Sequence, residues 1–461
     1  MTPATTGDVR IPVFASVAAW RADPRRAEDG AGTARPSVRE ATRAIIERVR
    51  REGDRALVDL AARLDRVQLD PPSLRVTPDE LAAAASGASP DARALLARTR
   101  DRIAAYHERQ REASFEMEIG PGATLGWRVL PVVSVGVYVP GGRAVYPSTV
   151  LMNTVPAAIA GVPRIALTTP PGALERSPIL AAAVEIAGVT EVYRVGGAQA
   201  VAAFAFGTGV VRRVDKVVGP GNAFVAEAKR QLGDVIGTDA VAGPSEVVVL
   251  ADGTASPAWV AADLLAQAEH GSGEERAILV TTSPEVGRAV AAEITRQAAD
   301  QPNRATIAAA LDRHGAVIVT RDLNEAVAVC EELAPEHLEV MTRDPDALAA
   351  RLPAAGALLL GPWSAVAAGD YGVGPNHVLP TGGTARFSSP LSVADFQKRQ
   401  SVARLSRAAL AARRADFEAF ARIEGFEAHR RSISIRFHGS PGDPDRPDPG
   451  PSPSAANHET P

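Results

Sequence analysis

The sequence predicts an α/β protein built on two successive, mainly parallel sheets, with helical regions before and after them. Short runs of β-branched residues alternate with Ala-rich runs of helical length from about residue 129 to residue 250, as in chains whose strands are joined by crossover helices. The same alternation then resumes, which indicates a second sheet. At 461 residues the chain is also too long for one compact core.

The region before the first sheet is predicted to be helical. From residue 36 to about residue 110, apolar side chains recur at helical intervals, as in Leu57, Leu60 and Leu64. Helices are expected again near the C-terminus, at 393–396, 405–421 and 423–431.

Two α/β regions are predicted because runs with a strand pattern alternate with runs with a helix pattern. In the first region, the expected strands are 129–139, 164–168, 191–195, 215–218 and 247–250, and the expected helices are 149–160, 178–187, 198–206 and 223–232. In the second region, a helix that ends at His270 is followed by expected strands at 277–281, 316–320 and 357–360 and expected helices at 286–297 and 323–333.

Composition excludes several classes of function. The net charge is −4 and the arginines are scattered, so nothing favours nucleic acid or anionic lipid as a partner. No run approaches the ~20 apolar residues that span a bilayer, and the start lacks a basic segment followed by an apolar core. We therefore expect a cytoplasmic protein that does not associate with membranes.

The single cysteine and the C-terminal tail are expected to carry no chemistry. Cys330 lies in an apolar helical pattern, where a buried, inert thiol is the usual outcome, and one cysteine excludes a disulfide within the chain. Residues 439–461 are rich in Pro, Gly, Asp and Ser, which predicts a disordered tail with no catalytic role.

Glycine-rich turns follow several of the expected strands. They are Pro140-Gly141-Gly142, Gly196-Gly197-Ala198-Gln199, Gly219-Pro220-Gly221-Asn222 and Gly243-Pro244-Ser245-Glu246. None is the fingerprint G-x-G-x-x-G, and each alone is explained by the backbone needs of a strand-to-helix turn. Together they indicate a shared phosphate or dinucleotide crevice, because the helix that follows Asn222 offers free backbone amides.

The end of the helix at His270 is a candidate half of a metal site. Ser256 reads as its N-cap and Pro257 as its first residue, so Gln267 and His270 lie one turn apart, about 5 to 6 Å between Cβ atoms. The alternative is a polar helix end that faces solvent. Without a cysteine cluster, zinc here needs nitrogen and oxygen ligands, and Gln267, His270, Asp370 and His429 supply two of each. Spacing alone does not establish that set.

Adjacent acid and imidazole groups give a candidate catalytic pair at Glu336 and His337. Such a pair suits a base and a second proton acceptor, because both groups titrate near neutrality when partly buried. The alternative is an ordinary pair of polar residues in a loop. Another acid and imidazole occur at Glu424 and His429.

Together these segments resemble the histidinol dehydrogenase family, from about residue 36 to residue 435. The blocks that carry the resemblance are long and occur in order: Tyr138-Val139-Pro140-Gly141-Gly142, Val195-Gly196-Gly197-Ala198-Gln199-Ala200, Gly219-Pro220-Gly221-Asn222, Ala242-Gly243-Pro244-Ser245-Glu246, Gln267-Ala268-Glu269-His270, Ala334-Pro335-Glu336-His337-Leu338, Asn376-His377-Val378-Leu379-Pro380-Thr381 and Glu424-Gly425-Phe426-Glu427-Ala428-His429. The departures, Pro375, Pro390 and the tail from Gly439, affect loop shape and not the reacting groups.

The resemblance implies two successive Rossmann-like parallel-sheet domains with helical N- and C-terminal regions. The expected boundaries are 1–128 for the helical N-terminal region, 129–245 for the NAD-binding domain, 246–388 for the domain with metal and catalytic residues, 389–438 for the helical dimerisation region and 439–461 for the tail.

The resemblance also implies roles for single residues. Gln267, His270, Asp370 and His429 are the implied ligands of one zinc ion per subunit, and Glu336 and His337 are the implied catalytic pair. The implied substrate contacts are Ser245, Gln267, His270, His337, Asp370, His377, Glu424 and His429, and the implied NAD-binding residues are Tyr138, Gln199 and Asn222. An intertwined homodimer is implied as well, with Glu424 and His429 acting in the partner's site.

The implied reaction is the zinc-dependent oxidation of L-histidinol to L-histidine through L-histidinal, with two NAD, in the last steps of histidine biosynthesis. Two alternatives stay open at this point. A paralogue with the same scaffold could oxidise another small hydroxylated substrate, or the chain could be a metal or nucleotide binder without activity. The intact pair Glu336-His337 disfavours the second alternative.

Overall fold

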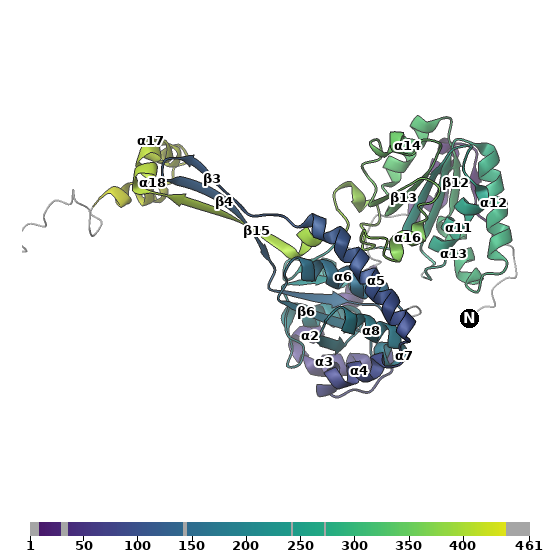
Figure 1. Ribbon diagram of the computed structural model, residues 1–461, viewed down its shortest axis with the longest axis horizontal. Helices are drawn as coiled ribbons and strands as arrows, with labels where there is room; N and C mark the ends of the chain where they lie inside the picture. Colours follow the sequence, from purple (N-terminus) through teal and green to yellow (C-terminus); the bar gives the residue numbers. More distant parts are fainter. Residues whose placement is uncertain (1–8, 29–35, 142–144, 241–242, 272, 439–461) are drawn as a thin grey trace, which may run out of the picture. The chain divides into compact units, whose positions relative to one another are not determined.

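A computed structural model describes residues 9–28, 36–141, 145–240, 243–271 and 273–438 (Figure 1). The chain divides into two compact units. The first consists of Met1–Arg111 and Pro131–Lys398, and the second consists of Glu112–Leu130 and Arg399–Pro461. Among the described residues, no helix combines the length and the hydropathy needed to cross a bilayer.

The first unit contains two sheets, and the first of these has the strand order β2-β7-β6-β5-β8-β9. Neighbouring strands are parallel except for β2 and β7. The strands are β2 (Arg75–Val76), β5 (Ser134–Tyr138), β6 (Arg164–Thr169), β7 (Glu191–Arg194), β8 (Lys216–Val218) and β9 (Gly237–Thr238). The central strand β5 is buried along its whole length, as expected for a strand covered on both faces.

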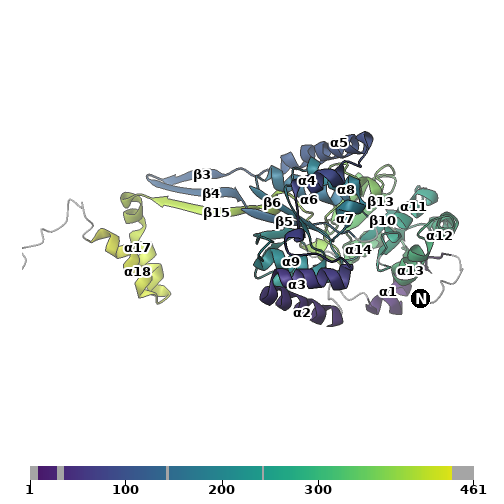
Figure 2. The same ribbon diagram turned by 90° about the horizontal axis from the view of Figure 1, so that it is seen from below.

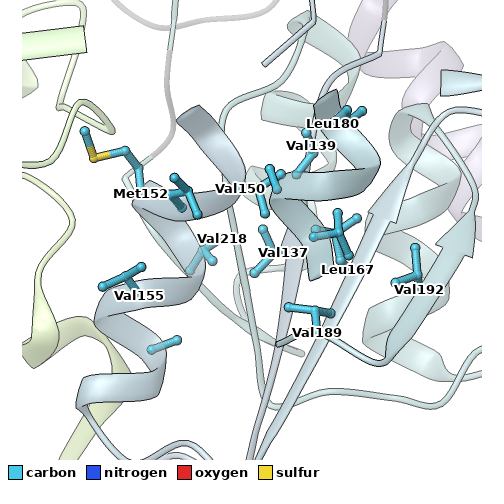
Figure 3. Close-up of a cluster of buried hydrophobic side chains, with 14 of the residues drawn as sticks. Val137, Val139, Val150, Met152, Val155, Leu167, Leu180, Val189, Val192 and Val218 are labelled. Atoms are coloured by element: carbon cyan, nitrogen blue, oxygen red, sulfur yellow. The ribbon is translucent and has the colours of Figure 1, made fainter. Parts of the chain in front are cut away.

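Helices cover both faces of this first sheet. The helices are α2 (Pro36–Glu52), α3 (Asp54–Leu60), η2 (Ala61–Asp65), η3 (Pro72–Leu74), α4 (Pro78–Ala85), α5 (Pro90–His107), η4 (Glu108–Gln110), α6 (Pro147–Ile159), α7 (Ala173–Arg176), α8 (Pro178–Ile186), α9 (Gly197–Phe206) and α10 (Ala223–Leu232). On one face, Val150 and Met152 of α6 belong to the same buried cluster as Val137 and Leu167 of the sheet (Figure 3). On the other face, α2, α9 and α10 pack in a second cluster around Phe204.

The second sheet has the order β1-β12-β11-β10-β13-β14, and all its strand pairs are parallel. Its strands are β1 (Val13–Phe14), β10 (Glu246–Ala251), β11 (Arg276–Thr281), β12 (Ala316–Val319), β13 (His337–Met341) and β14 (Ala357–Leu360). Its helices are α1 (Val17–Arg21), η1 (Pro24–Glu28), α11 (Pro257–Ala268), α12 (Pro284–Ala298), α13 (Arg304–His314), α14 (Leu323–Leu333), α15 (Asp346–Ala349), α16 (Val366–Asp370) and η5 (Thr384–Arg386). The later η6 (Val393–Phe396) packs in the core of the first sheet instead. Helices α11, α12 and α13 share one buried cluster with the sheet, and α1 and α14 share another.

The second unit is built on a small three-stranded ribbon, in which β3 and β4 are antiparallel, followed by helices. The strand order is β15-β4-β3, with β3 (Phe115–Gly120), β4 (Ala123–Pro131) and β15 (Gln397–Leu405), and the three strands lie side by side in Figure 2. After β15 come α17 (Arg407–Ile423), α18 (Glu427–Ser434) and η7 (Ile435–Phe437). A salt bridge between Arg399 and Glu112 joins the two chain segments of this unit.

The predicted α/β class with parallel sheets is confirmed. The regions expected to be purely helical also contain strands, which is a correction to the sequence prediction. The N-terminal region contributes β1, β2 and β3 and the start of β4, and the C-terminal region contributes β15. Side chains of β15 are almost all exposed, so this strand has no apolar alternation by which it could have been recognised.

Two smaller predictions also need correction. The strand expected at 129–139 is two strands, β4 and β5, which belong to different sheets. Helix α13 was not expected at all. Residues 439–461, expected to form a disordered tail, lie outside the described residues, and the domain boundaries remain predictions.

Candidate active site

A cavity of about 1550 Å³ lies in the first unit, and residues from both of its sheets line it. The first sheet contributes residues that follow the carboxyl ends of β5, β7 and β8, whereas the second sheet contributes residues at the amino ends of β10 and β13. The lining residues predicted from the sequence are Tyr138, Gln199, Asn222, Ser245, His270, Glu336, His337, Asp370 and His377. The volume exceeds that of a pocket for one small molecule.

Tyr138 ends β5 and contacts the turn that follows β7. Its hydroxyl accepts the backbone N–H of Gly197 at 3.2 Å, and burial raises its pKa to about 12, so the phenol stays neutral. The neighbouring Gln199 is buried, and its side-chain oxygen has no hydrogen-bond partner among the described residues. A buried acceptor without a donor is a place where a ligand N–H or O–H can bind.

The turn after β8 approaches Tyr138 so closely that only glycine fits. Gly219 has a φ of +108°, and a Cβ there would lie 2.2 Å from the carbonyl oxygen of Tyr138. Two buried charges hold the turn. The N–H of Gly219 donates to Asp239 at 2.7 Å, and Lys229 donates to the Gly219 carbonyl at 2.5 Å. The ammonium and the carboxylate also bond each other at 2.5 Å.

Asn222 begins α10 at the edge of the cavity. Its side-chain oxygen accepts the backbone N–H groups of Phe224 and Val225 at 3.0 and 3.2 Å, as the N-cap of a helix does. Helices α6 and α9 also begin at residues that line the cavity. Helix N-termini carry partial positive charge, so this wall of the cavity favours an anionic group such as a pyrophosphate.

Glu336 lies in the opposite wall. Among the described residues, no positively charged side chain contributes to the shift of its pKa. Burial is the main reason why its pKa is raised well above the usual value, and the nearby charges of Glu246 and Asp370 raise it further. The backbone N–H of Glu246, at 2.8 Å, and the hydroxyl of Ser245 oppose that rise. Once ionised, Glu336 is therefore a stronger base than a carboxylate with an ordinary pKa.

His337 is fixed in the tautomer that leaves Nε2 free. Its Nδ1 lies 3.1 Å from the carbonyl oxygen of Glu246, which can only accept, so Nδ1 carries the hydrogen. Its Nε2 lies 4.0 Å from a carboxylate oxygen of Asp370. Burial lowers the pKa of His337 despite that carboxylate, so the neutral ring is favoured and Nε2 can accept a proton.

Gln267 lies in the last turn of α11, and His270 follows two residues after Ala268, where the helix ends, rather than ending the helix as predicted. The Nδ1 of His270 lies 3.1 Å from the carbonyl oxygen of Gln267, which leaves Nε2 of His270 available as a ligand. Gln267 is 1% exposed, and its amide nitrogen has no hydrogen-bond partner among the described residues. Ser256 and Pro257 begin the helix as expected.

Asp370 and His377 come together on the same side of the cavity. The Nδ1 of His377 lies 3.1 Å from the carbonyl oxygen of Asp370, and its Nε2 lies 3.4 Å from the hydroxyl of Thr149. Burial is the main cause of the lowered pKa of His377. Thr149 belongs to α6 of the first sheet, so His377 bridges the two walls.

The donors in the second wall fit a zinc ion chemically. A glutamine amide, an imidazole and a carboxylate supply oxygen and nitrogen ligands, and the backbone carbonyls on the Nδ1 atoms of His270 and His337 are the usual outer partners of such imidazoles. The unpartnered Nε2 of Gln267 is a donor, so it can bind an acceptor while the amide oxygen is the atom that suits a cation. No cluster of three or more His, Cys, Asp or Glu side chains arranged to hold a metal occurs among the described residues.

Glu424 and His429 belong to the second unit. Glu424 follows the last residue of α17, and His429 lies in α18 with its ring 5.0 Å from that of Phe426. Both side chains are exposed within their unit. Since the cavity residues belong to the first unit, the part of Glu424 and His429 in the site remains a prediction.

Several residues of the site were not found from the sequence. Glu246, the first residue of β10, binds both catalytic residues through its backbone and accepts the N–H of Gly382 at 3.0 Å. Backbone contacts of this kind leave no sequence signal. Lys229 could have been noticed in the sequence, because it is a lysine in a chain whose basic residues are almost all arginine.

Cys330 is buried in the core against the second sheet, as predicted. Burial raises the pKa of its thiol far above the usual value, so no thiolate is available.

Comparison with known proteins points to one family. Residues 29–437 match the family described as histidinol dehydrogenase. A histidinol dehydrogenase from Geobacillus kaustophilus is 51% identical over 401 residues, which cover 87% of this chain and 94% of that relative. One from Cereibacter sphaeroides is 48% identical over 403 residues, which cover 87% and 92%.

A solved structure agrees with the sequence relatives. The crystal structure of histidinol dehydrogenase from Elizabethkingia anophelis superposes with a TM-score of 0.85 at 30% identity, covering 94% of this chain and 99% of that one.

Proposed function

The chain belongs to the histidinol dehydrogenase family, and on that premise we propose how its cavity oxidises L-histidinol. The protein is an oxidoreductase of histidine biosynthesis. The proposed reaction is a four-electron oxidation of L-histidinol to L-histidine through L-histidinal, with two NAD and one zinc ion per subunit. The observation that carries it is the buried pair Glu336 and His337 beside Asp370.

The zinc ligands would be Gln267, His270 and Asp370, with His429 as the fourth. Bound zinc supplies a positive charge that orients the imidazole and amine nitrogens of histidinol, while NAD supplies the hydride acceptor. Ser245, His377 and Glu424 would contact the substrate beside these ligands. Tyr138, Gln199 and Asn222 would bind NAD on the opposite wall, where the helix N-termini suit its pyrophosphate.

His337 is the proposed base of the first oxidation. Its Nε2 takes the hydroxyl proton as the C–H hydride leaves the same carbon, which gives the aldehyde, NADH and one proton. The neutral ring and the carbonyl of Glu246 on Nδ1 support this role, because they keep Nε2 unprotonated and aimed away from the strand. A base positioned in this way is worth about 10²- to 10⁴-fold in rate.

Glu336 is the proposed activator of water in the second oxidation. Its carboxylate accepts a proton from water as the oxygen adds to the aldehyde carbon, with His337 assisting. Loss of a second hydride then gives the carboxylate of histidine, a second NADH and two further protons. The raised pKa of Glu336 supports this role, because a carboxylate of low pKa is a poor base. Keeping the aldehyde bound between the steps prevents its loss to solvent.

We also propose that the enzyme is a homodimer in which Glu424 and His429 complete the partner's site. Mixing Gln267→Ala chains with His429→Ala chains should then regenerate one intact site per mixed dimer and restore part of the activity. A mixture that stays inactive contradicts this arrangement. The proposed location is the cytoplasm, where NAD and the biosynthetic intermediates are available.

The experiment that tests the function is the yield of NADH per molecule of L-histidinol in zinc-replete protein. We expect two NADH and one L-histidine. A yield of one, with an aldehyde as product, contradicts the four-electron reaction. A paralogue acting on another small alcohol is distinguished by growth, since this chain should restore a histidine auxotroph that lacks histidinol dehydrogenase.

A further inference from the structure

A buried ion pair lies behind the turn that follows β8. Lys229 belongs to α10, and Asp239 follows β9. Their side chains are each only 3% exposed, and the Nζ of Lys229 lies 2.5 Å from Oδ1 of Asp239. Neither is among the described residues that line the cavity. A ligand in the cavity therefore meets the turn and not the pair behind it.

Both charged groups also bind the backbone of one residue, Gly219. Oδ2 of Asp239 accepts the N–H of Gly219 at 2.7 Å, and Nζ of Lys229 donates to its carbonyl oxygen at 2.5 Å. An ammonium group offers three donors from one nitrogen, so Lys229 can bind the carbonyl and the carboxylate together. The peptide groups on both sides of the Gly219 Cα atom are therefore fixed before any ligand binds.

The pair joins three elements around this turn. Lys229 lies seven residues after Asn222, the N-cap of α10, and long side chains of a helix point toward its N-terminus. Asp239 comes directly after β9, the edge strand that pairs with β8 in parallel. The bonds of the pair therefore connect the end of β8, the start of α10 and the end of β9.

The same turn contacts the wall of the cavity that is proposed to bind NAD. Residues 220–222 follow Gly219 directly, and all three line the cavity. Gly219 also approaches the carbonyl oxygen of Tyr138 so closely that no Cβ fits between them. A shift of Gly219 would therefore displace the N-terminus of α10 and press against Tyr138.

We propose that Lys229 and Asp239 are positioning residues that fix the turn at Gly219 in the conformation that binds the pyrophosphate of NAD. Neither side chain touches the cofactor. The inference deepens the proposed function, on which it rests for the place of NAD. Stability alone explains a buried ion pair poorly, since two apolar residues would fill the same space at a lower desolvation cost. A turn that is fixed beforehand reduces the ordering cost of binding.

The test is the double variant Lys229→Met with Asp239→Asn in the full-length, zinc-replete protein. It removes both charges at similar volume, so no buried charge is left unpaired. Asparagine keeps an acceptor for the N–H of Gly219, whereas the Gly219 carbonyl loses its donor. We expect the Kd for NAD, measured by calorimetric titration, to rise about 10- to 100-fold, as when a binding group is misplaced. The KM for L-histidinol and the zinc content should stay close to those of the wild type.

The matched control is the double variant Arg164→Met with Glu191→Gln. This ion pair is also largely buried, at 17% and 10% exposure, and Arg164 likewise donates to a backbone carbonyl, that of Arg213, at 2.7 Å. It lies at the amino ends of β6 and β7, whereas the cavity lies at the carboxyl ends of this sheet. We expect the control to bind NAD as the wild type does. An equal loss of affinity in both variants would show a general effect of removing a buried pair and would overturn the positioning role.

A second measurement uses the wild type and does not depend on the folding of a variant. The amide of Gly219 is bound to a buried carboxylate, so its hydrogen exchange should be slow whether or not NAD is present. If the exchange is fast without NAD and becomes slow only when NAD binds, the cofactor and not the ion pair orders the turn, and the proposal is wrong.

The outcomes separate this inference from the proposed function. A wild-type protein that binds no NAD would overturn both. If the wild type binds NAD and the variant Lys229→Met with Asp239→Asn binds it equally tightly, only the positioning role fails. The melting temperature without NAD reports whether this variant folds, and the exchange of the Gly219 amide decides the proposal if it does not.

Discussion

The two sheets of the first unit present opposite ends to one cavity. The first sheet presents the carboxyl ends of its strands and the N-termini of α6, α9 and α10. The second sheet presents the amino ends of β10 and β13 and the C-terminal ends of α11 and α16. Helix N-termini favour anions and helix C-termini favour cations, so the two walls differ in the charge that they attract.

Because of this difference, the two walls suit different participants in the proposed reaction. The first wall suits the pyrophosphate of NAD, and the second wall suits a zinc ion and the amine of histidinol. The pKa values of three buried carboxyl groups also differ between the two sheets. Glu191 of the first sheet has a lowered pKa, because bonds from Arg164 and Tyr193 outweigh burial. Glu336 and Glu339 of the second sheet have raised pKa values, mainly through burial.

The largest effect is expected from His337→Asn. The variant removes the base from the second wall and leaves the first wall intact, so the rate of both oxidations should fall by about 10²- to 10⁴-fold. Calorimetric titration should give an unchanged affinity for NAD. Loss of NAD binding together with activity would contradict the proposal that the first wall binds NAD independently of the second wall.

On the first wall, the strongest expected effect is that of Gly219→Ala. Gly219 has positive φ and no room for a Cβ, so the free energy of unfolding should fall by about 1 to 3 kcal/mol and NAD affinity should fall with it. Gly188→Ala is the matched control, because Gly188 also has positive φ but nothing lies within 4 Å of its Cβ position. Urea unfolding measures the free energy of unfolding of the two variants, and calorimetric titration measures their affinity for NAD. Equal losses in the two variants would contradict a steric role at Gly219.

The pH dependence of local opening should differ between the sheets. Glu191 has a lowered folded pKa, so its stabilisation is present above the unfolded pKa and is lost as pH falls through the folded value. Hydrogen exchange should therefore show the amides of β6 and β7 opening first in acid, and Glu191→Gln should remove much of that sensitivity. Acid opening that starts in β10 and β13 instead would contradict the difference between the sheets.

The smallest effect is expected from Cys330→Ala. The thiol is buried and held neutral, so both oxidations should proceed at nearly the rate of the wild type. The NADH yield per histidinol measures this. If the variant performed only the first oxidation, the nucleophile of the second step in the wild type would be the thiol and not water.

Much of this architecture could be predicted from the sequence, because alternating apolar runs report directly on covered strands and helices. The end of α11 at Gln267 and His270 and the pair Glu336-His337 were found in this way. Strands β3 and β15 were missed, since strands exposed on both faces bury no alternating set of side chains.

Long-range contacts were beyond the reach of the sequence. Nothing near Lys229 or Asp239 in the sequence shows that both charges hold the turn at Gly219. The opposite orientation of the two sheets at the cavity is also a property of the tertiary fold.

The most direct test of the division between the walls is the NAD affinity of Gln267→Ala, measured by calorimetry on protein whose zinc content has been determined. We predict that zinc is lost while the Kd for NAD stays within about twofold of the wild-type value, because distant sites without shared partners act additively. Loss of NAD binding together with zinc would contradict the separation of an anion-binding wall from a cation-binding wall.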